Sequence, residues 1–294
     1  MVKQIRISLP VIESNYEGFN RLIRLAEETS DLSYANITMD FRAVSWFDAN
    51  MCAPLGAILY RLSRKLNTVS IVNIPSRVER ILSKNSFLSN YGHAKRLDEW
   101  GTTIRYNRLE PKDERYFGAY IERHFRYKAI PQMTPALRKK FWESIFELFS
   151  NAVIHSETKL GIFTCGQYFP KKQRLDFSIA DLGIGMRRNL RRKRGLNYSA
   201  EQAINWAMEG RNTTKTGSIP GGLGLKLLRE FIKLNNGCIQ VVSDRGFWEQ
   251  DRNGSVITKS FDFPFPGTVV NIEINTADTN SYALSSEIST EDIF

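Results

Sequence analysis

The spacing of apolar residues in the first hundred positions switches repeatedly between a period of two and a period near 3.6. The first spacing predicts half-buried strands, and the second predicts helices that bury one face. In chain order the predictions are a strand at 5–7, a helix at 19–25, a strand at 36–42, a helix at 55–66, a strand at 69–74 and a short helix at 78–82. This succession is typical of a compact α/β unit.

The second half of the chain begins with a long stretch of helical spacing from Pro135 to about Ser156, which predicts a helix. Between the halves, residues 100–136 are less regular, with a strand predicted at 102–109 and a charged helix at 116–125. After the long helix the pattern predicts strands at 160–165 and 175–180, a basic loop, a helix at 200–208, a glycine-rich segment, a helix at 225–234, and strands at 238–243 and 268–274.

The length of 294 residues suggests two domains, on the rough prior of about 150 residues per domain. We expect an N-terminal domain at 1–110, a connecting segment at 111–133 and a C-terminal domain at 134–275. Residues 276–294 are rich in Ser, Thr and acidic residues and contain no Lys or Arg, so we expect a disordered acidic tail.

Composition excludes several classes of protein. Hydrophobic residues make up 42% and charged residues 24%, which argues against wholesale disorder and against a fibrous repeat. No apolar run approaches the roughly 18–20 residues of a membrane helix, and the N-terminus lacks the apolar core of a signal peptide. We therefore expect a cytoplasmic protein with no membrane partner.

The cysteines lack CxxC spacing, and we expect buried thiols rather than a disulfide or zinc site at Cys52, Cys165 and Cys238.

The 41 Lys and Arg exceed the 31 Asp and Glu by 10, and the densest cluster is RRNLRRKR at 187–194, with six basic residues in eight. A solvated loop, an acidic partner, attraction of phosphates and contact with nucleic acid are all compatible with such a run. No aromatic residue is interleaved with it, and no zinc knuckle or RNP motif accompanies it. Sequence-specific nucleic-acid recognition therefore lacks support, and nonspecific contact is kept only as a secondary hypothesis.

Glu147 and Asn151 lie four residues apart in the predicted long helix and so share one face, with His155 one turn further. Such a face can place a carboxylate and an amide in a cleft. The amide oxygen can then bind Mg²⁺, and the carboxylate can act as a base. The alternative is an ordinary solvated helix face.

The sequence IADLGIGM ends a predicted strand with Asp181 and continues with Gly183 and Gly185. A carboxylate at a strand end can accept a hydrogen bond from an exocyclic amine such as that of adenine, and glycines allow the backbone to approach a flat group. The spacing matches neither the Rossmann motif nor the P-loop motif. A simple turn is the alternative.

Two further segments carry candidate ligand groups. The segment from Gly221 to Leu225 opens an apolar helix, where backbone N–H groups and the helix dipole favour phosphate. Its alternative is a flexible loop with a glycine cap. Thr268 begins the last predicted strand after Gly267, and its hydroxyl could reach a ligand, although Thr also simply favours strands.

In chain order, ELFSN with His155, DLGIG, GGLGL and a GT pair before the terminal strand resemble the N box, the two glycine boxes and the closing box of the Bergerat-fold (GHKL) ATP-binding superfamily. That superfamily includes gyrase, histidine kinases and MutL, and the match covers 134–275. The resemblance implies that Asn151 binds Mg²⁺ on the ATP phosphates, that Asp181 recognises the adenine amine, and that Glu147 is the catalytic acid, base or water-orienting residue. The implied cofactor-binding residues are Asn151, Asp181, Gly183, Gly185, Lys215, Gly222, Leu223, Gly224 and Thr268.

The N box and the short interval between the glycine boxes are most similar to the histidine-kinase and anti-sigma-factor-kinase branch. By this resemblance residues 209–225 form an ATP lid in which Lys215 contacts the γ-phosphate. Nothing in the chain resembles the dimerisation helix with a phosphoacceptor His that precedes the ATP domain of true histidine kinases. His155 lies inside the N box and is a poor acceptor candidate.

Residues 37–62 resemble the central strand, loop and helix of STAS domains, the fold of anti-sigma-factor antagonists, within a match from residue 3 to about 92. In that family a Ser or Thr at the start of the helix is phosphorylated by a partner kinase. Here Asp48 is followed by Ala49 and Asn50, and Ser45 lies upstream. The resemblance therefore does not imply regulated phosphorylation, and a module used only for packing or docking is the alternative.

Together these expectations describe an α/β (α+β sandwich) protein in which a STAS-like domain precedes a Bergerat-fold domain that binds ATP and Mg²⁺. The leading hypothesis is a protein Ser/Thr kinase or ATPase of the anti-sigma-factor-kinase type, with an acidic or STAS-like regulatory partner. The alternatives are an ATP-gated interaction switch with negligible turnover and a nonspecific nucleic-acid-associated ATPase. A mechanical ATPase that dimerises on ATP is disfavoured because no transducer domain follows residue 275, although a homodimer is compatible with the leading hypothesis.

Overall fold

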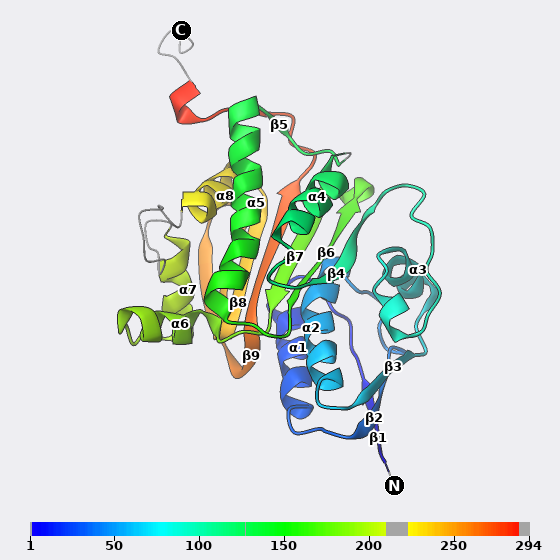
Figure 1. The fold of residues 1–294 in the computed structure, drawn as a ribbon. Coiled ribbons are helices and arrows are strands. Elements are labelled where there is room, and N and C mark those ends of the chain that lie inside the picture. Colours follow the sequence, from blue (N-terminus) through cyan, green and yellow to red (C-terminus); the bar gives the residue numbers. More distant parts are fainter. Residues whose placement is uncertain (1, 127, 210–222, 288–294) are drawn as a thin grey trace.

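The computed structural model describes residues 2–126, 128–209 and 223–287 (Figure 1). Its N-terminal part is a three-stranded parallel sheet in the order β1-β2-β3, with helices between the strands. The elements are β1 (Lys3–Ser8), α1 (Tyr16–Glu28), β2 (Ala35–Asp40), η1 (Ala49–Met51), α2 (Cys52–Ser63), β3 (Thr68–Val72), α3 (Ser76–Lys84) and η2 (Leu88–Tyr91). The predicted α/β alternation of this part is confirmed.

Local sequence explains where these elements begin and which faces they bury. The side chain of Asn15 caps α1 by accepting a hydrogen bond from Gly18 N at 2.9 Å. In β2, Ile37 and Met39 are buried, whereas Thr38 between them is only half-buried. One face of the parallel sheet therefore contributes to a core, and the opposite face is more polar.

The C-terminal part is a five-stranded sheet in the order β4-β6-β7-β9-β8, in which every pairing is antiparallel. Its elements are β4 (Thr103–Leu109), α4 (Glu114–Phe125), α5 (Pro135–Ser156), β6 (Ile162–Phe169), η3 (Pro170–Lys172), β7 (Arg174–Asp181), α6 (Gly185–Arg194), α7 (Ala200–Met208), α8 (Leu223–Leu234), β8 (Cys238–Gln250) and β9 (Val256–Asn275). Among the described residues, no helix has the length and apolar character that crossing a bilayer requires.

The two faces of the five-stranded sheet contribute to two different hydrophobic cores. On β7, Phe177 and Ile179 belong to the core that contains α5 and α8, whereas Ala180 belongs to the core that contains α1 and α2. Helix α2 contacts β6 and β7, and α1 contacts β9. Helices α1 and α2 therefore lie between the two sheets, while α5 crosses the other face of the five-stranded sheet, in front of it in Figure 1.

Strand β4 lies in the C-terminal sheet, although the expected boundary assigns residues 1–110 to the N-terminal domain. It pairs with β6 and forms one edge of the five-stranded sheet. The apolar pattern predicts that residues 102–109 form a strand, but it does not predict which strand they pair with. In the structure the backbone groups of β4 form hydrogen bonds with those of β6. Strands β8 and β9 are also longer than predicted, because they pair with each other far beyond residues 243 and 268.

The basic run at 187–194 is part of helix α6, so the expectation of a loop is wrong. Arg and Lys are good helix formers, and the run buries Asn189 and Leu190 while its basic side chains are exposed. Arg192 forms an ion pair with Glu157 at 2.9 Å. The charge cluster thus covers most of the exposed surface of a short helix.

The segment 276–287 is structured, so the expectation of disorder is wrong for this part of the tail. Strand β10 (Ser281–Tyr282) pairs with β5 (Gln132–Met133), and a short turn, η4 (Ser285–Glu287), follows. The ring of Tyr282 lies 5.4 Å from that of Phe231 on α8. An aromatic anchor and backbone pairing therefore outweigh the polar composition, and residues 288–294 lie outside the described residues.

Candidate functional site

Helix α5 carries the first two candidate residues. It begins at Pro135 and is capped by the side chain of Thr134. Apolar residues of α5, such as Phe149, are buried in the core that α5 and α8 form with the five-stranded sheet. Glu147 and Asn151 are half-buried, and they lie four residues and so about 6 Å apart along the helix axis.

The carboxylate of Glu147 reaches the N-terminus of α8. Its Oε2 accepts a hydrogen bond from Gly224 N at 3.0 Å. A Cβ at position 224 would lie 2.2 Å from this oxygen and 3.2 Å from Ser144 Cα, so a side chain there would displace the carboxylate. Because helix N-termini stabilise negative charge, the structure joins two predicted residues in a favourable contact.

Asn151 lies five residues before the end of α5, on the same helix as Glu147. Within the described parts of the chain its side chain makes no hydrogen bond. Mg²⁺ bound with nucleotides usually takes one or two protein oxygens and completes its shell with phosphate and water. A half-buried amide oxygen of this kind fits that requirement.

Asp181 is the last residue of β7 and is only 4% exposed. Its Oδ1 accepts a hydrogen bond from Gly183 N at 2.8 Å, and Thr268 lies opposite it in the sheet. Burial raises the pKa of Asp181 to about 7, although hydrogen bonds from the backbone of Gly183 and Thr268 act in the opposite direction. No basic side chain of the described residues compensates the burial. The carboxyl group is thus a desolvated acceptor.

The glycines around Asp181 allow close contacts inside the protein. A Cβ on Gly183 would lie 2.1 Å from the carbonyl oxygen of Ser156 at the end of α5, and one on Gly267 would lie 2.0 Å from the carbonyl oxygen of Asp181. Gly185 has a φ of +74°, a left-handed conformation that favours glycine. These contacts account for the glycines structurally, and their contact with a ligand stays a prediction.

Ser243 belongs to the same region, although no sequence motif singles it out. Its Oγ accepts a hydrogen bond from Met186 N at 2.9 Å and lies 3.0 Å from Thr268 Oγ1. Ser243 thus connects the first turn of α6 to β8 and β9. Ser243 and Thr268 are cross-strand partners, and local sequence carries no signal of that pairing.

Helix α5 connects the parts of the candidate site. Near its middle Glu147 contacts α8, and at its end Ser156 contacts the Gly183 turn that follows Asp181. Asn151 lies between these two contacts. Of the remaining predicted residues, Lys215 and Gly222 lie outside the described residues, and Leu223 is described only as the first residue of α8.

The loop residues 48–50, just before α2, are buried between the two parts of the molecule. Asn50 Nδ2 donates hydrogen bonds to Asn271 Oδ1 at 2.6 Å and to Ser178 Oγ at 3.1 Å. Asp48 forms an ion pair with Arg174 on β7 at 3.2 Å. This loop therefore contacts the face of the sheet opposite to α5.

No protein-family model matches this chain, and no curated protein matches its sequence. Glu147 and Asn151 are half-buried on α5, Asp181 is buried at the end of β7, and Gly224 lies in the first turn of α8. The arrangement offers a buried acceptor at one end, a half-buried carboxylate beside a helix N-terminus at the other, and a half-buried amide on α5 between them.

Proposed function

We propose that residues 134–275 form a Bergerat-like domain that binds Mg-ATP along α5, and that the N-terminal part is a STAS-like module. The observation that carries this proposal is the double contact of α5, with α8 through Glu147 and with the turn after Asp181 through Ser156. These contacts bring three of the four boxes of the resemblance to one helix. Thr268 of the fourth box is the cross-strand partner of Asp181.

In this proposal the adenine lies at the Asp181 end. An exocyclic amine would donate a hydrogen bond to the buried carboxylate, which is a strong acceptor because few waters compete for it. Thr268 supports this contact through its backbone, which already hydrogen-bonds Asp181. The ring would pack beside the Gly183 turn.

The phosphates then extend toward the start of α8. Asn151 would hold the Mg²⁺, which neutralises charge on the phosphate oxygens. The Gly224 N–H, now bound by Glu147, is the donor that a phosphate would compete for. When ATP binds, a phosphate that takes this N–H would displace the carboxylate of Glu147 from it.

The released Glu147 carboxylate can take part in phosphoryl transfer. The acceptor oxygen, from a protein hydroxyl or water, bonds to the γ-phosphorus while the bond to the β–γ bridging oxygen breaks. The proton of the acceptor passes to Glu147, and ADP leaves. Positioning and charge neutralisation supply most of the catalysis in such reactions.

The phosphoacceptor is expected on another protein. The STAS-like loop of this chain has Ala49 and Asn50 in place of a hydroxyl residue, and Asn50 is fully buried against the sheet face opposite to α5. A regulatory partner that is acidic or STAS-like, and that approaches the α5 side, therefore suits the proposal.

Two substitutions test the site. Asp181→Asn should weaken ATP binding at least about tenfold, because the amide offers a weaker acceptor than a carboxylate. Glu147→Gln should bind ATP within about threefold of the parent and lose about 100-fold in phosphoryl transfer or hydrolysis. Isothermal titration gives the affinity, and γ-labelled ATP distinguishes labelled protein from free phosphate.

Glu143→Gln is the matched control, because this glutamate is exposed on the same helix and pairs only with Lys140 at 2.8 Å among the described residues. It should change neither quantity. An Asp181→Asn protein that titrates with ATP like the parent would overturn the site assignment.

A second function, an ATP-gated switch with negligible turnover, is favoured by the hydrogen bond between Glu147 and Gly224. A carboxylate held by a helix N-terminus is not placed beside an acceptor hydroxyl. ATP binding without release or transfer of labelled phosphate in the parent protein would support the switch over the enzyme.

A further inference from the structure

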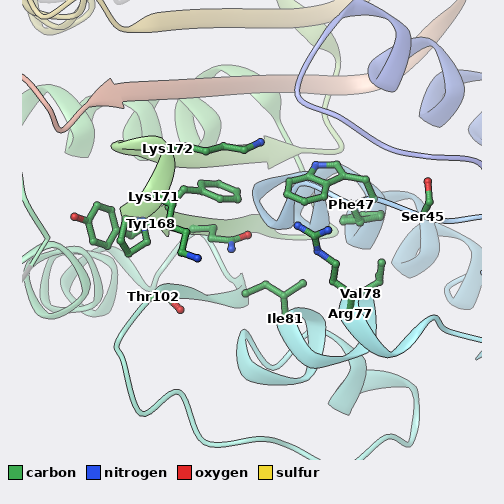
Figure 2. Close-up of a pocket in the computed structure, with 13 residues that line it drawn as sticks. Ser45, Phe47, Arg77, Val78, Ile81, Thr102, Tyr168, Lys171 and Lys172 are labelled. Carbon is green, nitrogen blue, oxygen red and sulfur yellow. The ribbon is translucent and has the colours of Figure 1, made fainter.

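A cavity of about 400 Å³ opens between the N-terminal part and the turn that joins β6 to β7 (Figure 2). One wall comes from the loop around Trp46 and from α3, and the other comes from the end of β6 and from η3. The turn lies at the end of β7 remote from Asp181, seven residues and so about 24 Å along the strand. The cavity is therefore separate from the proposed nucleotide site.

The described lining of this cavity is basic. It contains three cations and no carboxylate: Arg77 from α3, and Lys171 and Lys172 from the β6–β7 turn. All three side chains are exposed, and within the described residues none forms an ion pair. Figure 2 shows Arg77 extending from α3 toward the side on which the two lysines lie.

The indole ring of Trp46 holds two of these cations. Arg77 Cζ lies 4.6 Å and Lys172 Nζ lies 4.5 Å from the ring centroid. The ring is fixed by a hydrogen bond from its Nε1 to Asp48 Oδ1 at 2.9 Å. A cation over a ring face keeps N–H donors available, so both groups are positioned and still able to bind an anion.

The first turn of α3 adds backbone donors. Its N-cap residue is Pro75, and no side chain caps the helix among the described residues. Arg77 and Val78, whose N–H groups belong to this first turn, both line the cavity. Uncapped N–H groups at a helix N-terminus favour an anionic ligand.

The remaining lining is largely apolar. Phe47, Val78 and Ile81 come from the N-terminal part, and Tyr168 and Phe169 come from β6. A solvated basic patch would require neither a cavity nor an aromatic wall. Concave apolar walls with a few convergent polar groups are typical of sites for small molecules.

We propose that this cavity binds a small organic anion that carries a flat apolar group. A phosphate or carboxylate is held by Arg77, Lys172 and the first turn of α3, and the apolar group packs against the walls supplied by Phe47 and Phe169. Because the two walls belong to different parts of the molecule, the bound anion also stabilises their contact.

The test uses the full chain and 1-naphthyl phosphate, with 2-naphthoate to compare a carboxylate and 1-naphthol as the neutral analogue. Isothermal titration should show saturable binding of at least one anion and at least tenfold weaker binding of 1-naphthol. Arg77→Gln and Lys172→Gln should each weaken anion binding about tenfold, the loss expected for one charged hydrogen bond. Binding should also raise the melting temperature of the parent.

Arg64→Gln and Lys139→Gln are matched controls, because both residues are exposed and lie outside the cavity lining, and they should bind like the parent. Far-UV circular dichroism verifies that every variant is folded. Unchanged anion affinity in Arg77→Gln and Lys172→Gln, or equal affinity for 1-naphthol, would refute the proposal. Asp181→Asn should keep anion binding, and its loss there would place the probe in the nucleotide site instead.

Discussion

The carboxyl group of Asp181 is buried at the end of β7, with hydrogen bonds from backbone N–H groups and no basic partner among the described residues. Its ionised form is poorly solvated, and burial therefore raises its pKa to about 7. A ligand that donates a hydrogen bond would compensate part of this loss. The burial of the Asp181 carboxylate, which lowers stability in the free protein, would thus favour binding of a ligand that donates a hydrogen bond to it.

Stability should depend on pH through this residue. The folded pKa of about 7 exceeds the ordinary value of 3.8, so the folded state binds more protons between these values and the contribution of Asp181 declines as pH rises toward 7. Asp181→Asn removes this dependence. Urea unfolding of both proteins should show the difference in unfolding free energy moving in favour of the variant by about 2–3 kcal/mol from pH 5 to pH 8. A difference that does not change with pH would contradict the assignment.

At the scale of elements, α5 organises the candidate site because neighbouring segments approach it at fixed points. Gly183 passes so close to Ser156 that no side chain fits, and Gly224 approaches the carboxylate of Glu147 about as closely. These glycines differ in what surrounds them. Backbone blocks a side chain at Gly183, whereas the end of a flexible side chain blocks one at Gly224.

Gly183→Ala should therefore destabilise the fold by about 2–3 kcal/mol, because the new methyl group overlaps the backbone of α5. Gly118→Ala, inside α4, is the control, since a Cβ at this position meets only Phe146 of α5 among the described residues, at 3.8 Å. That change should stabilise the protein by about 0.5–1 kcal/mol. Thermal and urea unfolding measure both, and equal stabilities of the two variants would argue against the close approach.

At the scale of the whole molecule, helices α1 and α2 pack against both sheets. Helices α1 and α2 belong to one hydrophobic core with residues from β6, β7, β8 and β9. The polar centre of this contact is Asn50, which joins Ser14, Ser178 and Asn271 through hydrogen bonds. We therefore expect the two parts to unfold together.

Asn50→Ala should lower the unfolding free energy by about 1–3 kcal/mol, because buried partners lose a hydrogen bond. Asn36→Ala, on the polar face of the parallel sheet, should change it by less than about 0.5 kcal/mol. In the parent, urea transitions followed by circular dichroism and by tryptophan fluorescence should coincide. Two separate transitions would show that the shared core does not couple the parts.

Much of the secondary structure could be predicted because it depends on local spacing. The helix at 135–156 was predicted at its observed bounds, and so was the helix at 200–208, where Ser199 provides a capping box. Helix α6 and strand β10 were not predicted. In both cases composition suggested solvation, while the burial of Leu190 and the packing of Tyr282 against Phe231 stabilise the observed structure.

By itself the sequence determined the α/β order of the elements, because that order depends on spacing along each segment, and it singled out Glu147, Asn151 and Asp181 as candidates. Only the tertiary structure decided that β4 joins the second sheet, that α1 and α2 cover the second face of that sheet, and that Ser243 lies beside Thr268. The tertiary structure also creates the cavity that Arg77 and Lys172 line. These features depend on which distant surfaces exclude water together and which backbone edges pair, and no local pattern encodes either.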